Sequence, residues 1–330
     1  MSERAGHWAE LQERGAAWGP VFLGFLYRIL GRTVCLAAMA PVIPYFYLAA
    51  GNQRRASLAY LERVWRVLGR SPRPGHWQGL QHFFAFGDSL IDRLGAWIGR
   101  IDRRDLESVD SPEFDAMRAD ARGALILSGH IGATEIVRAV ASRHQRRRVN
   151  IVTHTAQTAN YNALIAKFAP QSQVFLIQAS DFGVATAMAI SAAVERGEWV
   201  VIMGDRVSMR AAERVVHVNF LGERAALPQG PFQLAVALRC PVYSLFCVKR
   251  NGRYAVRVSL LSDLTVVPRG GREAALARLV QRYSQVLEAL VRATPYQWFN
   301  FYDFWSARGE APPGDEFSRP SVTGDESRCD

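Results

Sequence analysis

Lysine is scarce in this sequence, and its cysteines show no pairing pattern. Only two of its 40 basic residues are lysines, Lys167 and Lys249, so arginine carries the net charge of +10. The four cysteines show no CxxC spacing and no paired framework, which indicates a reducing compartment and no structural metal. Residues 1–20 are polar and lead to no short apolar stretch with a small-residue cleavage site, so we expect no secretory signal.

The composition predicts a globular chain with a basic surface. Of 330 residues, 49% are hydrophobic, which is enough for one large domain or two modest ones and excludes a disordered chain. The arginine excess suits anionic lipid, nucleic acid or an acidic carrier protein, or else reflects codon usage alone. Because the arginines are scattered and no nucleic-acid-binding module is recognisable, we expect no nucleic-acid partner.

One apolar run is long enough to be a candidate membrane segment. Residues Thr33–Ala50 contain no charge over 18 positions, the shortest length expected to span a bilayer. Pro41 and Pro44 would break a straight helix, and the Tyr45-Phe46-Tyr47 cluster is typical of an interface. We therefore expect a bent in-plane or re-entrant anchor within residues 1–56, with a full span and a buried hairpin as the alternatives.

The remaining pattern predicts an α/β fold. Residues 57–100 show helical spacing of apolar side chains, interrupted by a Pro/Gly break at 71–75. Strands alternate with helices after Gly123, which favours a largely parallel sheet, and a long amphipathic helix is expected at about 273–293. Strands are expected at 124–127, 150–153, 174–177, 199–203, 242–248 and 254–259, and helices near 134–142, 159–168 and 183–196.

A histidine and a glutamate follow the first of these strands. His130 lies just past the strand end and Glu135 opens the next helix, five residues later. A carboxylate that pairs with an imidazole fixes its tautomer and stabilises the imidazolium, which equips the pair to deprotonate a hydroxyl. The alternative is a surface histidine beside an ordinary first-turn glutamate. Zinc is not expected, because the helical zinc motif needs histidines four residues apart.

Three further segments carry candidate site residues. Asp205 and Arg206 follow a second buried strand and would lie on the same sheet edge as His130, or form a simple Asp-Arg turn. Gly230 stands where an apolar helix begins, so backbone amides there suit a carbonyl or phosphate oxygen. The aromatic segment 295–305 would line an acyl tunnel, dock on a membrane or close the core.

The order of these segments resembles the lysophospholipid and lipid A late acyltransferase superfamily. The resemblance rests on a hydrophobic amino-terminal anchor, a strand ending in HxxxxE (His130, Glu135) and a strand ending in Gly204-Asp205-Arg206. A Phe-Leu-Gly block at 220–222, a Pro-x-Gly-Pro block at 228–231 and a tryptophan-bearing segment follow. It implies a glycerolipid-acyltransferase-like layered sheet with flanking helices, covering roughly residues 15–305.

The resemblance also implies an activity. The protein would transfer a fatty acyl chain from acyl carrier protein or acyl-CoA to a hydroxyl of a membrane lipid or glycolipid such as a lipid A precursor. It would act at the cytoplasmic face of the bacterial inner membrane, without metal or redox cofactor. His130 would be the general base and Glu135 its partner, while Asp205 and Arg206 would position the acceptor or donor.

The sequence departs from the lipid A pattern near its end. Lipid A enzymes usually place a basic string after the tryptophan, whereas Trp298 here is followed by Phe-Asn-Phe-Tyr-Asp-Phe. This leaves an aryl-polyene-type lipid or a lysophospholipid as alternative acceptors, and a non-catalytic lipid-binding protein as an alternative of another class. We expect an anchor region at 1–56, an acyltransferase domain at 57–306 and a disordered, acidic tail at 307–330.

Overall fold

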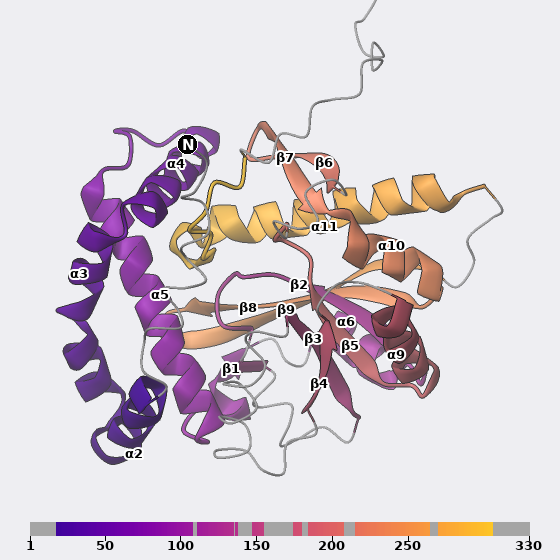
Figure 1. Cartoon of the computed structure of the whole chain (residues 1–330), viewed down its shortest axis with the longest axis horizontal. Helices are drawn as coiled ribbons and strands as arrows, with labels where there is room; N and C mark the ends of the chain where they lie inside the picture. Colours follow the sequence, from indigo (N-terminus) through magenta and orange to yellow (C-terminus); the bar gives the residue numbers. More distant parts are fainter. Residues whose placement is uncertain are drawn as a thin grey trace, which may run out of the picture.

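The computed structural model describes residues 18–107, 111–134, 136–137, 147–154, 174–179, 184–207, 215–264 and 270–305. The helix expected at 159–168, most of the one at 134–142 and the tail at 307–330 lie outside the described residues. Figure 1 shows a helical layer beside a sheet that carries further helices on its faces.

The amino-terminal half of the described chain is helical. Its elements are α2 (Trp18–Met39), α3 (Val42–Ala49), α4 (Gly51–Val67), α5 (His76–Trp97), the 3-10 turn η1 (Arg103–Asp105) and α6 (Pro112–Ala119). The predicted Pro/Gly break at 71–75 is the connection between α4 and α5. The predicted domain boundary at 56/57 falls inside α4, whose Tyr60 and Leu61 belong to the main core.

The second half alternates strands and helices, as the pattern predicted. The strands are β1 (Leu106–Glu107), β2 (Ala124–Ser128), β3 (Val149–His154), β4 (Val174–Ala179), β5 (Trp199–Met203), β6 (Val215–Phe220), β7 (Glu223–Pro228), β8 (Pro241–Arg250) and β9 (Arg253–Asp263). The helices are α9 (Val184–Glu195), α10 (Gln229–Leu238), α11 (Arg272–Ala293) and the turn η3 (Pro295–Gln297).

The main sheet is parallel over most of its width. Its seven strands run in the order β1-β9-β8-β2-β5-β3-β4. The pairs β8–β2, β2–β5, β5–β3, β3–β4 and β1–β9 are parallel. Only the β8–β9 pair of this sheet is antiparallel. This confirms the predicted α/β class with flanking helices. Parallel strands in such a sheet are covered on both faces, which explains why β2 reads as an unbroken apolar run.

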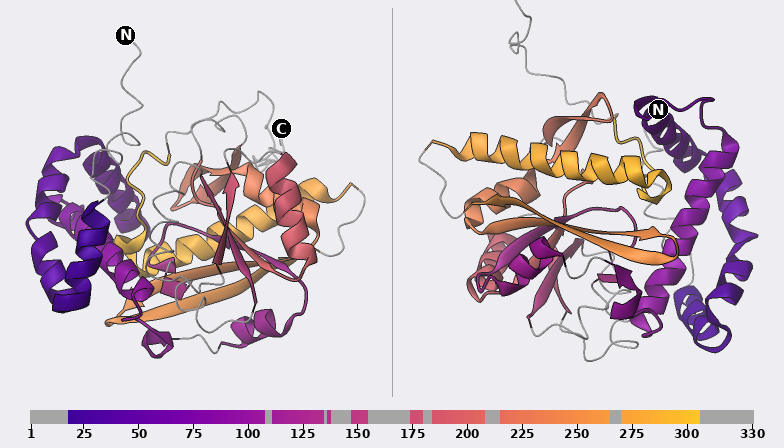
Figure 2. Two further views of the ribbon diagram at one scale, coloured as in Figure 1. Left: turned by 60° about the horizontal axis from the view of Figure 1, so that its bottom comes forward. Right: turned by 180° about the vertical axis from the view of Figure 1, so that it is seen from behind.

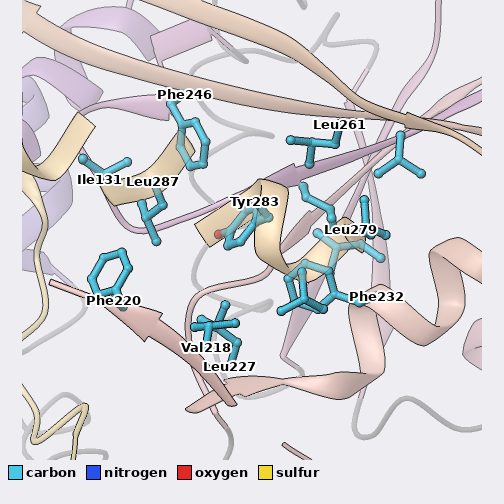
Figure 3. Packing of buried hydrophobic residues seen from close by; sticks show 14 of the residues in the cluster. Ile131, Val218, Phe220, Leu227, Phe232, Phe246, Leu261, Leu279, Tyr283 and Leu287 are labelled. Carbon is cyan, nitrogen blue, oxygen red and sulfur yellow. The ribbon is translucent and has the colours of Figure 1, made fainter. Parts of the chain in front are cut away.

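The two faces of the sheet contact two separate apolar layers. On β2, Leu125 and Leu127 point into the larger cluster with α10 and α11, whereas Ala124 and Ile126 point into the smaller one with α6. This alternation follows from the two-residue period of a strand. Helix α11 contributes a stripe that includes Leu279, Tyr283 and Leu287 (Figure 3), and the predicted amphipathic helix at 273–293 is thereby confirmed.

The hairpin β6–β7 was not predicted. Its two strands pair antiparallel outside the main sheet and turn at Leu221 and Gly222, which both have positive φ angles of 53° and 77°. Two successive residues of that kind are typical of the tight turns that match the twist of hairpin strands. A sequence signal for the hairpin exists, because the Leu-Gly pair stands between an apolar segment with Val218 and Phe220 and the run Ala225-Ala226-Leu227. Alanine has a low strand propensity, so this run does not indicate a strand clearly.

The apolar run at 33–50 is divided between two helices. Met39 ends α2 and Pro41 precedes α3, so the predicted break occurs at Pro41, while Pro44 is accommodated in the first turn of α3. Both helices pack against α5 (Figure 2). By length and composition alone, the stretch Gly24–Ala49 is the one described helical segment apolar enough to cross a membrane.

Candidate active site

Two motifs meet at the carboxyl edge of the main sheet. Strand β2 ends at Ser128 and β5 ends at Met203, and these two residues are paired in the parallel register. The Gly204 amide donates to the Ser128 carbonyl at 2.9 Å, which carries the pairing one residue further. His130 and Asp205 therefore leave neighbouring strands side by side, whereas the sequence predicted only that they share this edge of the sheet.

Asp205 holds the His130 imidazole and its backbone at once. Nδ1 of His130 donates to Oδ1 of Asp205 at 2.8 Å, and the His130 backbone N–H donates to Oδ2 at 2.7 Å. The carboxylate is 1% exposed and the imidazole 32% exposed. Since a carboxylate accepts from Nδ1–H, the lone pair of the neutral ring lies on Nε2. A base oriented in this way is suited to taking a proton from a hydroxyl.

The surroundings of Asp205 keep it ionised. Its complete burial raises the pKa, but the nearby His130 and Arg206 and the hydrogen bonds from His130 outweigh burial and lower the pKa to about 2. The indole Nε1–H of Trp298 also donates to Oδ2, at 3.1 Å. A buried carboxylate with several donors and a neighbouring cation remains charged near neutral pH, so it can stabilise an imidazolium.

Close backbone packing explains the glycine two residues after His130. Gly132 has a φ of 63°, and a Cβ there would lie 2.0 Å from the Cys247 carbonyl oxygen. Its N–H donates to the Gln297 carbonyl, and the next N–H, of Ala133, donates to the Cys247 carbonyl, both at 2.7 Å. These two amides are therefore committed to the protein itself, and the loop is clamped between β8 and η3.

The aromatic segment 295–305 closes the core and also clamps the two motifs. The Phe299 N–H donates to the His130 carbonyl at 2.9 Å, and Nη2 of Arg206 donates to the Phe299 carbonyl at 2.8 Å. The Tyr302 hydroxyl donates to the backbone carbonyl of Asp205 at 3.3 Å. Of the three predicted roles, core closure is confirmed, since Trp298 and Phe304 are 1% exposed.

A buried histidine supports this segment from the helical layer. Nε2 of His82 donates to the Trp298 carbonyl at 2.9 Å, while its Nδ1 accepts from the Ser57 hydroxyl at 2.8 Å. Burial lowers the pKa of His82 to about 4, against the smaller opposing effect of that backbone bond. His82 is thus neutral near pH 7 and aligns the segment that carries Trp298.

The roles predicted for three site residues stay predictions. Glu135 lies outside the described residues, so its pairing with His130 stays a prediction. Asp205 was expected to position the acceptor or donor, and that role stays a prediction, while the contacts described for its carboxylate are with His130 and Trp298. Gly230 is the second residue of α10, where Phe232 packs on Tyr283 with ring centroids 5.3 Å apart, and its ligand role stays a prediction.

The role of Trp298 as a donor to Asp205 was not predicted, nor was the contribution of His82. The tryptophan was visible in the sequence, but no local pattern linked it to a carboxylate 93 residues earlier. Among the described residues no cluster of three metal-ligating side chains occurs.

The comparison with protein-family models decides the family. The model for bacterial lipid A biosynthesis acyltransferases matches residues 92–306, about two thirds of the chain. The chain belongs to this acyltransferase family. No curated protein matches the chain.

Membership in the lipid A biosynthesis acyltransferase family confirms the resemblance drawn from the motifs. It supports acyl transfer to a lipid acceptor as the class of reaction. The match contains His130, Asp205 and Trp298, and it begins within α5, so α2, α3 and α4 lie outside it. The aryl-polyene branch stays a prediction.

Proposed function

We propose that the protein transfers a fatty acyl chain from acyl carrier protein or acyl-CoA to a hydroxyl of a membrane lipid or glycolipid such as a lipid A precursor. The site of action would be the cytoplasmic face of the bacterial inner membrane. The family supports the reaction class. The observation that carries the residue assignment is the 2.8 Å contact between His130 and the buried carboxylate of Asp205.

The proposed reaction begins with a proton transfer. Nε2 of His130 removes the proton of the acceptor hydroxyl while the oxygen of that hydroxyl attacks the thioester carbonyl carbon. The resulting tetrahedral intermediate collapses by breaking the carbon–sulfur bond. The thiolate leaves and takes the proton from the imidazolium, which yields the ester and a free thiol. Asp205 stabilises the imidazolium between these two steps because it stays ionised.

The cation Arg206 supports recognition of an anionic group at this edge. Its guanidinium already donates to the Phe299 carbonyl, which fixes the side chain beside the site. Arginine offers five donors in a rigid fork, so one bond to a carbonyl leaves capacity for a phosphate or a developing oxyanion. We therefore keep Arg206 as the proposed contact to the donor or acceptor. Gly230 and Glu135 keep their predicted roles as proposals.

A second acceptor class has one observation in its favour. Where lipid A enzymes usually carry a basic string, Phe299 and Phe301 follow Trp298 and pack on rings of α5. Because positive charge is missing there, a lipid with fewer phosphates, such as an aryl-polyene-type lipid or a lysophospholipid, is the proposed alternative.

The deciding experiment uses the purified full chain in detergent. It is incubated with labelled acyl carrier protein or acyl-CoA and a membrane lipid extract, and the labelled product is identified by mass spectrometry. We expect His130→Ala to lower turnover by about 10²–10⁴-fold with little change in folding. His217→Ala, a half-buried histidine on β6, is the matched control and should keep activity. Near-normal turnover by His130→Ala would overturn the assignment, and lipid binding without any turnover by the wild type would favour a non-catalytic protein.

A further inference from the structure

The amino-terminal helices expose an unusually apolar surface. Six large apolar side chains on α2 and α3 are more than half exposed, and Val34 and Val42 lie beside them at 40% and 37%. We call this set the apolar ridge. Its members are Phe25, Ile29, Leu30, Val34, Val42, Tyr45, Phe46 and Leu48. Large exposed apolar side chains gathered on two contacting helices are typical of a contact with a partner or a membrane.

The opposite face of the same helices is locked onto α5. Three side chains from α2 and α3 enter notches formed by glycines eight residues apart on α5. A Cβ at these glycines would lie 2.5–2.7 Å from the inserted side chain. The pairs are Gly95 with Tyr27, Gly87 with Ile43 and Gly79 with Tyr47. The inserted residues are at most 6% exposed, so this face is not available to lipid.

A partly buried ion cluster fastens α2 at its middle. Nε of Arg32 lies 2.8 Å from Oδ1 of Asp92, and the guanidinium also pairs with Asp88. Nζ of Lys249, on β8, lies 2.6 Å from Asp92 and 2.7 Å from Asp88. Asp92 is 1% exposed, so removing Arg32 from it would leave a buried carboxylate with one cation fewer.

This attachment decides between the two ways of meeting a membrane. If the segment 24–49 crossed a bilayer, Arg32 would have to leave Asp92, and the three notches of α5 would open to solvent. If the segment lies flat, the contacts with α5 persist and the apolar ridge faces outward. Helices with one face packed on the protein and an apolar face turned outward suit the interface plane of a membrane.

The charge of this layer matches an anionic surface. Residues 18–77 contain eight arginines and a single acidic residue, Glu62. Arg32 pairs with carboxylates of α5, and Arg63 and Arg66 pair with Glu223 of β7. Among the described ion pairs, none joins Arg28 or Arg55 to a carboxylate, so these cations can meet lipid phosphates.

We infer that α2 and α3 bind in the plane of an anionic bilayer through the apolar ridge, without crossing it. The inference rests on the proposed action on a membrane lipid. It adds which face contacts the bilayer and that both ends of the segment stay on one side.

Side-specific labelling tests the topology. Single cysteines replace the exposed Arg28 or Asn52 in a full chain with Cys329→Ser, and sealed inside-out and right-side-out vesicles are treated with a membrane-impermeant maleimide. The native Cys35, Cys240 and Cys247 are buried. In-plane binding makes both positions react from the same side. Reaction from opposite sides would establish a span and overturn the inference.

Vesicle binding tests the surface. The purified chain is sedimented with vesicles of phosphatidylcholine and phosphatidylglycerol, and Phe46→Asp with Leu48→Asp should weaken binding about tenfold or more, since each side chain loses its burial in lipid. Val184→Asp with Met188→Asp, at exposed apolar positions on α9, is the matched control and should bind normally. Equal loss in both, or in neither, would overturn the assigned surface.

The same ridge variant separates the inference from the proposed function. Its acyl transfer to detergent-dispersed acceptor should equal that of the wild type, because the ridge lies outside the active site. If the wild type shows the vesicle binding and labelling pattern but no acyl transfer, the proposed function fails while the docking surface stands.

Discussion

Replacing Asp205 by asparagine removes a charge while keeping the size of the side chain. In the wild type the carboxylate accepts from Nδ1 of His130, the His130 backbone N–H and the Trp298 indole. An amide has one acceptor oxygen, so its NH₂ group would face at least one of these donors. The favoured response is for the imidazole to change tautomer or turn away, which removes the base from Nε2.

The expected loss of activity is large. An asparagine in place of the acid beside a catalytic histidine costs about 10⁴-fold in turnover in serine proteases, where the tautomer becomes wrong. We expect Asp205→Asn to lower kcat by about 10³–10⁴-fold while leaving the apparent KM for the acyl donor near that of the wild type. The assay is initial-rate acyl transfer by the purified chain.

The pH dependence of stability gives an independent test of the lowered pKa of Asp205. Its pKa falls from an ordinary 3.8 to about 2 on folding. The ionised form therefore stabilises the fold by about 2 kcal/mol above pH 4, and this contribution is lost as the pH falls toward 2. Asp205→Asn should lack that part of the pH dependence in urea unfolding.

Glu198 supplies the matched control. It is another buried carboxylate, just before the opposite end of β5, and its pKa is lowered chiefly by its bond to Arg196 and also by Asn150. Glu198→Gln should cost stability but keep kcat. If Asp205→Asn keeps more than a tenth of wild-type turnover, the reasoning about the His130 pair is refuted. If Glu135→Gln alone abolishes turnover, Glu135 is the partner that matters.

Three further predictions concern the packing around the site. Gly132→Ala should abolish activity and lower Tm, since its Cβ would meet the Cys247 carbonyl at 2.0 Å; normal activity would contradict the clamped loop. Tyr283→Phe should cost about 1 kcal/mol in urea unfolding, the usual value of one hydrogen bond such as that to the Ser128 carbonyl, and keep turnover. Because the folded pKa of His82 is about 4 against 6.5, wild-type stability should be full above pH 6.5 and fall by about 3 kcal/mol toward pH 4. His82→Gln should remove that part of the slope, and an unchanged slope would exclude His82 as its source.

The regular elements were largely predictable from local patterns. Strands β2 and β5 appear as unbroken apolar runs because both of their faces are covered. The helix α11 appears as an apolar stripe because one of its faces packs on the sheet. In each case the burial of a single element leaves a period in its own residues, and no distant contact is needed to detect it.

The contact between His130 and Asp205 was not predictable in the same way. The sequence pointed to Glu135 because it stands five positions away, whereas Asp205 is 75 positions away. What joins Asp205 to His130 is the neighbouring register of β2 and β5, and a strand pattern contains no information about which strands are neighbours. For the same reason, the hydrogen bond from the Trp298 indole to Asp205 was not predictable.

The sequence by itself determined the class of the fold, the strand ends that carry His130 and Asp205, and the apolar character of residues 33–50. These properties depend on residue type and spacing along one segment. Only the tertiary structure decided that Asp205 holds the imidazole and that α2 and α3 lie along α5 with one face outward. The first depends on the order of the strands in the sheet, and the second on notches such as that at Gly87, where α3 packs on α5. A contact between segments that are distant in the sequence forms only once the fold brings them together.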